Sequence, residues 1–311
     1  MTANILQLCP LMPALEKALS ERFTVHRFFE AADPDAFLGE HAERLRGVVT
    51  GGHIGIPTEL AARLPALEIV AINGVGFDKV DLLEAKRRGV RVSNTPDVLT
   101  EDVADLAIGL IISALRQIPR GDAHVRAGRW PSGDLALGSK VSRRRYGIFG
   151  FGRIGQAIAR RLEGFDAELA YASRSPVETT VRNAGSLHEL AAWSDVLVIA
   201  ASASAETRNI VDAQVFNALG PKGVLVNVAR GSLVDEPALL DALETGRIAG
   251  AALDVFADEP RVPERLLALP NVVLTPHMAS ATHETRQAMA DLVLANLDAH
   301  FAGREMPSAL V

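Results

Sequence analysis

A glycine-rich turn after a short apolar run is the feature that most constrains this chain. Gly150, Gly152 and Gly155 follow the apolar residues 146–149 with the spacing G-x-G-x-x-G, and a helical pattern comes next. A second apolar run, 167–172, completes the order strand, turn, helix, strand. In this context the glycines allow a tight turn, close approach of a pyrophosphate and close packing of helix on strand. The sequence therefore predicts a dinucleotide-binding unit; the alternative is a glycine turn in another α/β fold.

The residues after the second strand indicate which dinucleotide is bound. A site selective for NAD normally places Asp or Glu there to bind the ribose 2′-hydroxyl. This chain has Ser173, Arg174 and Ser175 instead. A guanidinium can pair with a 2′-phosphate that a carboxylate would repel. The sequence therefore favours NADP(H) over NAD(H), and the alternative is that Arg174 is a solvated surface charge.

Further cofactor contacts are expected from the helix that follows the turn and from the ends of later strands. The N-terminus of a helix offers free N–H groups and a partial positive charge to phosphates. Besides the glycines and residues 173–175, the predicted cofactor-binding residues are Phe151, Arg153, Ile154, Ala201 and Val228.

Short apolar strands alternate with helical stretches along the rest of the chain, which is typical of α/β proteins with parallel sheets. We expect one small α/β domain over residues 1–98 and a second around the glycine turn. Residues 100–118 read as a long helix that ends before Pro119. The polar stretch 120–140 is expected to be a lid or a partner-contacting arm.

Composition excludes several classes of function. The formal charge of −6 gives no reason to expect nucleic acid or an anionic membrane as a partner. Cys9 is the only cysteine, so no intrachain disulfide can form and a reducing compartment is expected. The N-terminus does not resemble a signal peptide and no apolar run has transmembrane length, so we expect a cytoplasmic protein. No metal site is expected.

Three residues that could carry chemistry follow three successive strands. Arg230, Glu259 and His277 should meet at one edge of a parallel sheet, beside a bound cofactor. A guanidinium can bind a carboxylate and polarise a carbonyl, and an imidazole can exchange a proton at neutral pH. A glutamate beside the histidine would favour its protonated form and orient the ring. Together they suit reduction of a 2-keto acid to a 2-hydroxy acid.

Each of these residues also has a plainer interpretation. Arg230 could be a surface arginine in a turn, Glu259 a turn carboxylate, and His277 a structural histidine. Three other histidines, at positions 53, 124 and 283, are also available. His277 is preferred because of its position after a strand.

The turn after the strand 69–73 is a further candidate site, because the N–H groups of Val75 and Gly76 could hold a carboxylate. It could equally be an ordinary βα turn.

Several motifs resemble the D-2-hydroxyacid dehydrogenase family over nearly the whole chain. They are GFGRIG (150–155), NVARGSLVDE (227–236), GAALDVFADEP (250–260), TPHMASATHETR (275–286), NGVGFDKVD (73–81) and TEDVADLAIGL (100–110). Within the family, ASRS (172–175) and GPKGVLVNVARG (220–231) resemble NADPH-dependent glyoxylate/hydroxypyruvate reductases and plant hydroxyphenylpyruvate reductases. Two departures, the proline-free loop 201–205 and Ala279 where others have glycine, bear on specificity.

The resemblance implies a Rossmann cofactor domain (99–285) inserted into a flavodoxin-like substrate domain (1–98 plus 286–311), a cleft that shuts on binding, and a homodimer. It also implies that Arg230, Glu259 and His277 are catalytic, that Asp254 accepts from the nicotinamide carboxamide, and that Val75 and Gly76 bind the substrate carboxylate.

The expected function is NADPH-dependent reduction of small 2-keto acids such as glyoxylate and hydroxypyruvate. One alternative is an oxidation-direction enzyme such as phosphoglycerate dehydrogenase, which Ser173 and Arg174 disfavour. Another is a nucleotide-sensing, corepressor-like binding protein, which would not consume NADPH with any keto acid.

Overall fold

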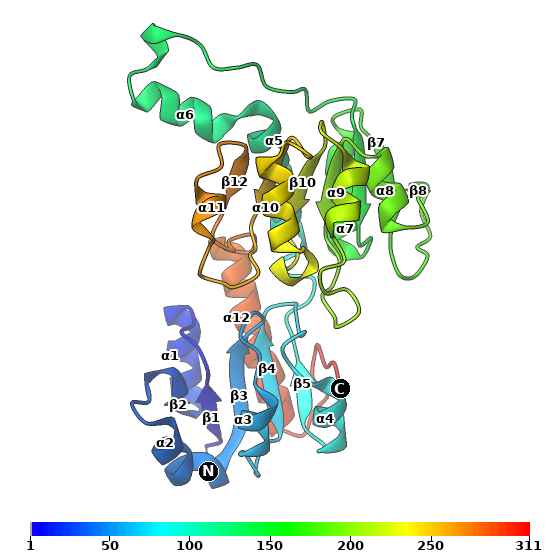
Figure 1. Ribbon diagram of the computed structural model, residues 1–311. Coiled ribbons are helices and arrows are strands. Elements are labelled where there is room, and N and C mark those ends of the chain that lie inside the picture. Colours follow the sequence, from blue (N-terminus) through cyan, green and yellow to red (C-terminus); the bar gives the residue numbers. More distant parts are fainter. Residues whose placement is uncertain (1) are drawn as a thin grey trace. The chain divides into compact units, whose positions relative to one another are not determined.

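The computed structural model describes residues 2–311, and the chain divides into two compact units, each with its own parallel sheet (Figure 1). One unit contains the described residues up to Leu99 together with Ser280–Val311, and the other contains Thr100–Ala279. The predicted boundaries differ by one residue (98 against 99) and by six residues (285 against 279). The six residues, 280–285, are the approach to the last helix and its first turn, and this helix packs in the first unit.

The first unit is a five-stranded parallel sheet with strand order β2-β1-β3-β4-β5. This is the flavodoxin-like order, as predicted. The strands are β1 (Asn4–Gln7), β2 (Thr24–Arg27), β3 (Leu45–Gly51), β4 (Ile69–Asn73) and β5 (Arg91–Ser93). The chain end covers the outer edge of β5 through an antiparallel bridge between Ala309 and Ser93.

Helices cover both faces of this sheet, with one apolar cluster under each layer. The helices are α1 (Pro13–Arg22), α2 (Pro34–His41), α3 (Thr58–Ala62), α4 (Leu82–Arg87), α12 (His283–Phe301) and the 3₁₀ turns η1 (Phe28–Glu30) and η2 (Ala42–Arg44). α1 and α12 share one cluster with residues of β1, β3 and β4.

The second unit is a seven-stranded parallel sheet with order β12-β11-β10-β9-β6-β7-β8. The strand order reverses between β6 and β9, which is the switch point where ligands bind in open α/β sheets. The strands are β6 (Arg145–Phe149), β7 (Glu168–Ala172), β8 (Arg182–Asn183), β9 (Val196–Ile199), β10 (Val224–Asn227), β11 (Gly250–Leu253) and β12 (Val272–Leu274). The predicted Rossmann arrangement is therefore present.

Nine helical segments belong to this unit. They are α5 (Thr100–Arg116), α6 (Ile118–Arg126), α7 (Arg153–Glu163), α8 (Leu187–Trp193), α9 (Ala213–Leu219), α10 (Glu236–Glu244), α11 (Glu264–Leu267), η3 (Trp130–Ser132) and η4 (Gly231–Leu233). Among the described residues, no helix is both long and apolar enough to cross a bilayer.

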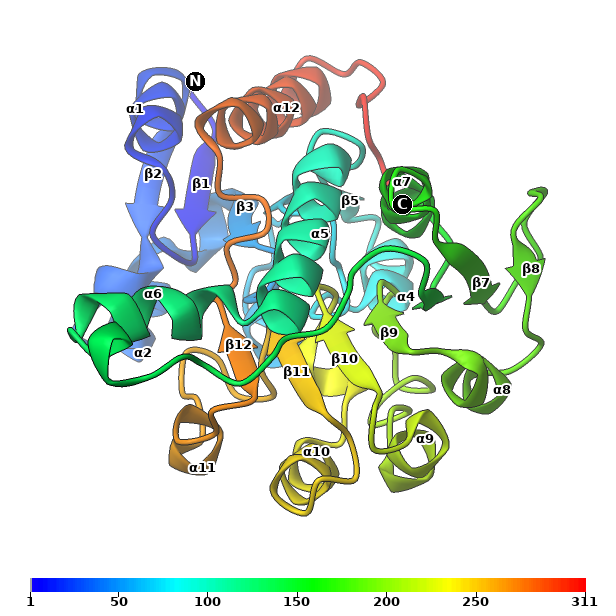
Figure 2. The same ribbon diagram turned by 90° about the horizontal axis from the view of Figure 1, so that it is seen from above.

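The segment after α5 differs from the prediction. The helix ends at Arg116 and not at Ile118, because Gln117 adopts a left-handed backbone with φ 55°. Pro119 does not stop a helix: it lies in the first turn of α6, where its missing N–H has no cost. α6 and the segment after it project from the second unit (Figures 1 and 2), and no residue of α6 is buried.

Candidate active site

The three predicted catalytic residues lie on loops that follow neighbouring strands of the second sheet. β11 pairs in parallel with both β10 and β12, so the carboxyl ends of the three strands lie side by side. Arg230 follows β10, Glu259 lies on the loop after β11, and His277 follows β12. The topology therefore brings these loops to one edge of the sheet, as the sequence predicted.

His277 and Glu259 form a direct pair. The imidazole Nδ1 lies 2.6 Å from Glu259 Oε2, and Glu259 Oε1 accepts the Phe256 N–H at 3.0 Å. A carboxylate only accepts, so Nδ1 carries the shared proton and Nε2 is the nitrogen left for chemistry. Both side chains are partly exposed, 32% for His277 and 21% for Glu259.

Asp254 holds the loop that carries His277. This carboxylate is fully buried; Oδ1 accepts from Thr275 Oγ1 at 2.6 Å and from the Met278 N–H at 2.9 Å, and Oδ2 accepts from the Ala279 N–H at 3.0 Å. The His277 N–H donates to the Asp254 carbonyl at 2.9 Å. His277 has φ 50°, a left-handed conformation that is costly for a residue with a side chain. The bonds to Asp254 keep the loop in this conformation.

The loop of Arg230 is shaped by two residues beside it. The Asn227 side chain, which is buried, donates to the Arg230 carbonyl and accepts the Ala229 N–H, both at 3.0 Å. A Cβ on Gly231 would lie 2.0 Å from the Phe256 carbonyl carbon and oxygen. Only glycine allows this approach, which places the Arg230 loop against the start of the segment that leads to Glu259.

The glycine turn has the geometry that its spacing predicts. Gly150 has φ 92°, and a Cβ there would lie 2.4 Å from Ala201 Cα. A Cβ on Gly155 would lie 2.1 Å from the Gly150 carbonyl oxygen, so α7 packs directly on the turn. Gly152, by contrast, has no atom within 4 Å of its Cβ position. The turn thus leaves room at Gly152, in front of the start of α7, where a phosphate would bind.

The other predicted cofactor residues surround this turn. Phe151, Arg153 and Ile154 belong to the turn and the first residues of α7. Ala201 contacts Gly150 from the end of β9, and the buried Val228 follows β10. Ser173 Oγ donates to the Ser175 carbonyl at 2.6 Å, which closes the loop after β7 around an exposed Arg174. Among the described residues, the Arg174 side chain has no ion-pair partner.

In the first unit, the turn after β4 offers backbone donors. Asn94 Nδ2 donates to the Val75 carbonyl at 2.8 Å, and the Thr95 N–H donates to the Gly74 carbonyl at 2.9 Å. The N–H groups of Val75 and Gly76 donate no hydrogen bond to the part of the chain described. They are available to an acceptor.

The other three candidate histidines lie on other segments of the chain. His53 is exposed after β3, His283 begins α12, and His124 donates from Nε2 to the Gly133 carbonyl at 2.8 Å. Two residues that support the site, Asn227 and Thr275, were not predicted from the sequence. Their roles depend on bonds to a turn and to a residue 21 positions away, which no local pattern indicates.

Comparison with known proteins identifies the relatives of this chain. Residues 108–279 match the family model described as D-isomer specific 2-hydroxyacid dehydrogenase, NAD binding domain. The chain is 50% identical over 309 residues to hydroxyphenylpyruvate reductase of Plectranthus scutellarioides, covering 99% of both chains. It is 48% identical, with the same coverage, to a glyoxylate/hydroxypyruvate reductase of Arabidopsis thaliana.

A solved structure is also similar over the full length. The NADPH-dependent glyoxylate/hydroxypyruvate reductase of Sinorhizobium meliloti, crystallised with NADP and malonate, has a TM-score of 0.94 and 45% identity. The similarity covers 100% of this chain and 97% of that one.

Proposed function

The chain belongs to the D-isomer specific 2-hydroxyacid dehydrogenase family, and from this membership we propose that it reduces small 2-keto acids, such as glyoxylate and hydroxypyruvate, with NADPH. The observation that carries the proposal is the pairing of His277 with Glu259 at 2.6 Å on loops that follow adjacent strands. A histidine oriented by a carboxylate is suited to proton transfer.

Each catalytic residue has a distinct task. The Arg230 guanidinium binds the carboxylate and polarises the carbonyl of the substrate. His277 donates the proton from Nε2 to the carbonyl oxygen as it becomes a hydroxyl. Glu259 keeps the ring oriented and stabilises the imidazolium before transfer. The dinucleotide, when bound, supplies the hydride that the carbonyl carbon receives.

The cofactor is proposed to be NADP(H). The open space at Gly152 fits a pyrophosphate, and the exposed Arg174 fits a 2′-phosphate. The Sinorhizobium relative is NADPH-dependent and binds NADP, which supports this assignment. Phe151, Arg153, Ile154, Ser173, Ser175, Ala201 and Val228 are proposed to complete the cofactor site. Asp254 is proposed to accept from the nicotinamide carboxamide while it holds the His277 loop.

The first unit is proposed to bind the substrate carboxylate. Free N–H groups at Val75 and Gly76 are suitable donors for an anion.

We further propose that the protein is a cytoplasmic homodimer and that α6 and the segment up to residue 140 contact the partner. Exposed apolar side chains on this arm support the proposal; they are Ile118, Val125, Trp130 and Leu137. Sedimentation as a monomer would contradict it.

The test is an NADPH-oxidation screen with glyoxylate, hydroxypyruvate, pyruvate and phenylpyruvate. We expect turnover with the first two, and turnover reduced about 100-fold or more in His277→Ala. A cofactor-sensing binding protein would bind NADPH without consuming it. An enzyme of the phosphoglycerate dehydrogenase type would instead prefer NAD and the oxidation of a hydroxy acid.

The cofactor assignment has its own test. Arg174→Ala should raise the KM for NADPH about tenfold or more and leave the KM for NADH unchanged, because only NADPH carries the 2′-phosphate. Lys222→Ala, an exposed change before β10 at the opposite end of the strand, is the control. A wild-type preference for NADH would contradict the assignment.

A further inference from the structure

Arg286 is a half-buried cation without a side-chain partner in the described part of the chain. Among residues 2–311, its guanidinium forms no hydrogen bond or ion pair, and its only bond is from its backbone N–H to the Thr282 carbonyl at 3.0 Å. Burial lowers the pKa of this arginine below its ordinary value, and no neighbouring acid offsets the effect. We propose that Arg286, with the N–H groups of Val75 and Gly76, forms an anion subsite for the carboxylate of the substrate; this inference rests on the proposed function.

The direction of α12 places Arg286 at the carboxyl edge of the five-stranded sheet. Near the C-terminus of α12, His300 Nε2 contacts Glu68 Oε2 at 3.4 Å, and Glu68 directly precedes β4. Near its N-terminus, Thr285 Oγ1 donates to the Val98 carbonyl at 3.2 Å, and Val98 lies beyond the end of β5. The helix therefore runs antiparallel to the strands (Figure 1).

Helix and strand dimensions put Arg286 at the height of the Val75–Gly76 turn. Arg286 lies 14 residues before His300, or about 21 Å along the helix at about 1.5 Å per residue. Gly74 lies six residues after Glu68, or about 20 Å along the strand at about 3.3 Å per residue. The two distances agree, so Arg286 is level with the end of β4.

The side chain of Arg286 continues the sheet-facing side of α12. Ala290, Val293 and Leu297 pack in the cluster shared with β1, β3 and β4. Arg286 precedes them at the helical spacing i, i+4, i+7, i+11, so it belongs to the same stripe. Because the strands end at its level, the guanidinium extends over the edge of the sheet and not onto its face. This explains why it is half-buried and unpaired.

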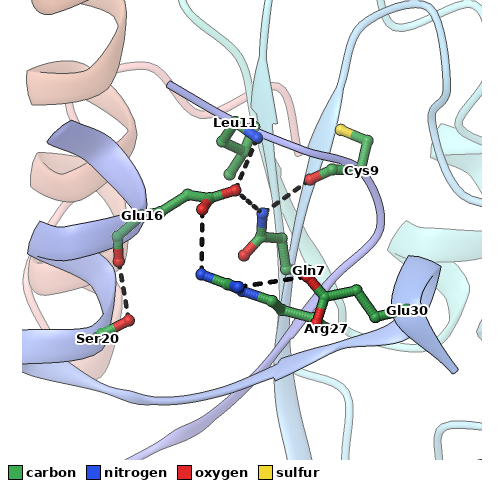
Figure 3. A network of polar contacts seen from close by, with 7 residues as sticks. All are labelled: Gln7, Cys9, Leu11, Glu16, Ser20, Arg27 and Glu30. Atoms are coloured by element: carbon green, nitrogen blue, oxygen red, sulfur yellow. Dashed lines mark hydrogen bonds and ion pairs between the residues drawn. The ribbon is translucent and has the colours of Figure 1, made fainter. Parts of the chain in front are cut away.

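Glu16, which contacts the last residue of β1, does not neutralise Arg286. Glu16 accepts from Gln7 Nε2 at 2.7 Å, from the Leu11 N–H at 3.0 Å and from Arg27 Nη2 at 3.1 Å (Figure 3). Burial alone would raise the pKa of Glu16, but these donors lower it. The Glu16 carboxylate is thus already paired with its own cation, Arg27.

Unsatisfied polar atoms gather at the same edge. In the described part of the chain, the buried side-chain oxygens without a hydrogen-bond partner are Gln7 Oε1, Asn73 Oδ1 and Thr95 Oγ1. They lie at the end of β1, at the end of β4 and just after β5. Buried polar groups are normally satisfied, and the two amide oxygens only accept, so water molecules that donate to them are expected at this edge. The donors at this edge are the Arg286 guanidinium and the two N–H groups, and a carboxylate supplies the acceptors that they need.

The test uses oxamate, an unreactive amide analogue of a 2-keto acid, titrated calorimetrically into the NADPH-bound protein. Arg286→Gln should weaken oxamate binding about tenfold or more, with NADPH affinity unchanged. Arg286→Lys keeps the charge and should recover part of the affinity. Arg304→Gln, an exposed arginine just after α12, is the matched control and should bind as the wild type does.

The melting temperature distinguishes a role of Arg286 in ligand binding from a role in the stability of the fold. Because the buried charge has no partner, Arg286→Gln should melt at the same temperature as the wild type or higher without ligand. Unchanged oxamate affinity in Arg286→Gln, or equal losses of NADPH affinity and melting temperature, would overturn the proposal. Oxamate binding does not require turnover, so a wild type that binds oxamate but reduces no keto acid would refute the proposed function and leave Arg286 supported.

Discussion

The Nδ1 atom of His277 lies 2.6 Å from Oε2 of Glu259, although 18 residues separate them in the chain. Glu259 is anchored by the Phe256 N–H, and His277 by the loop bonded to Asp254. Hydrogen bonds to the backbone therefore fix the position of both members of the pair. An acid–base histidine with this support has one preferred ring orientation and one tautomer.

Glu259→Gln should lower kcat about 10- to 100-fold, because an amide no longer stabilises the imidazolium. NADPH affinity should not change. The loss should appear in kcat and not in the KM for NADPH, because Glu259 acts on the proton step through His277. Glu264→Gln, an exposed change at the start of α11, is the control. An unaltered kcat would remove Glu259 from the proton step.

Asp254 should matter for both stability and activity. Asp254→Ala leaves the Thr275 hydroxyl and two backbone N–H groups without their acceptor, so the free energy of unfolding should fall by about 2–4 kcal/mol. Thr275→Val removes one of these bonds and should cost about 1–2 kcal/mol. Thr275→Val should also lower kcat, because the loop that carries His277 loses a support. Thr275→Ser keeps the hydroxyl and should keep the kcat of the wild type. Equal kcat in the valine and serine variants would show that the clamp does not position His277.

Two glycines of the turn should respond differently to alanine. Gly155→Ala places a Cβ 2.1 Å from the Gly150 carbonyl oxygen, so the melting temperature should fall by several degrees. Gly152→Ala meets no atom within 4 Å and should melt like the wild type without cofactor. It should nevertheless bind NADPH more weakly, because the methyl group occupies the proposed pyrophosphate space. Unfolding curves and NADPH titrations of both variants test these expectations. Wild-type NADPH affinity in Gly152→Ala would contradict the proposed pyrophosphate position.

Stability should decrease at alkaline pH through Tyr146. Burial raises the pKa of Tyr146 to about 12, and its hydroxyl donates to the Val141 carbonyl at 2.7 Å. In the unfolded chain a tyrosine ionises near pH 10. The neutral phenol therefore stabilises the fold fully below about pH 10, and this contribution, about 2–3 kcal/mol, is lost as pH rises to about 12.

The measurement is urea unfolding at pH 8, 10 and 11.5 for the wild type and Tyr146→Phe. The variant should be about 1 kcal/mol less stable at pH 8, since the Val141 carbonyl loses its donor. It should lose less stability than the wild type between pH 10 and 11.5. Parallel curves would mean that another group causes the alkaline loss.

Local patterns in the sequence were sufficient to predict the alternating strands and helices and the glycine turn. They also showed that each of the three catalytic candidates follows a strand. These follow from interactions between near neighbours: apolar periodicity, capping and the steric freedom of glycine. The break at Gln117 was not predictable in this way, because a left-handed residue inside an apolar helical pattern has no strong local signal.

Only the tertiary structure decided which residues support the site. Parallel pairing of β10, β11 and β12 put Glu259 against His277, and the buried carboxylate of Asp254 found Thr275 across 21 residues. The unpaired state of Arg286 depends likewise on where the sheet ends beside α12. Such contacts join residues far apart in sequence, so burial and strand order determine them and the composition of any single segment does not.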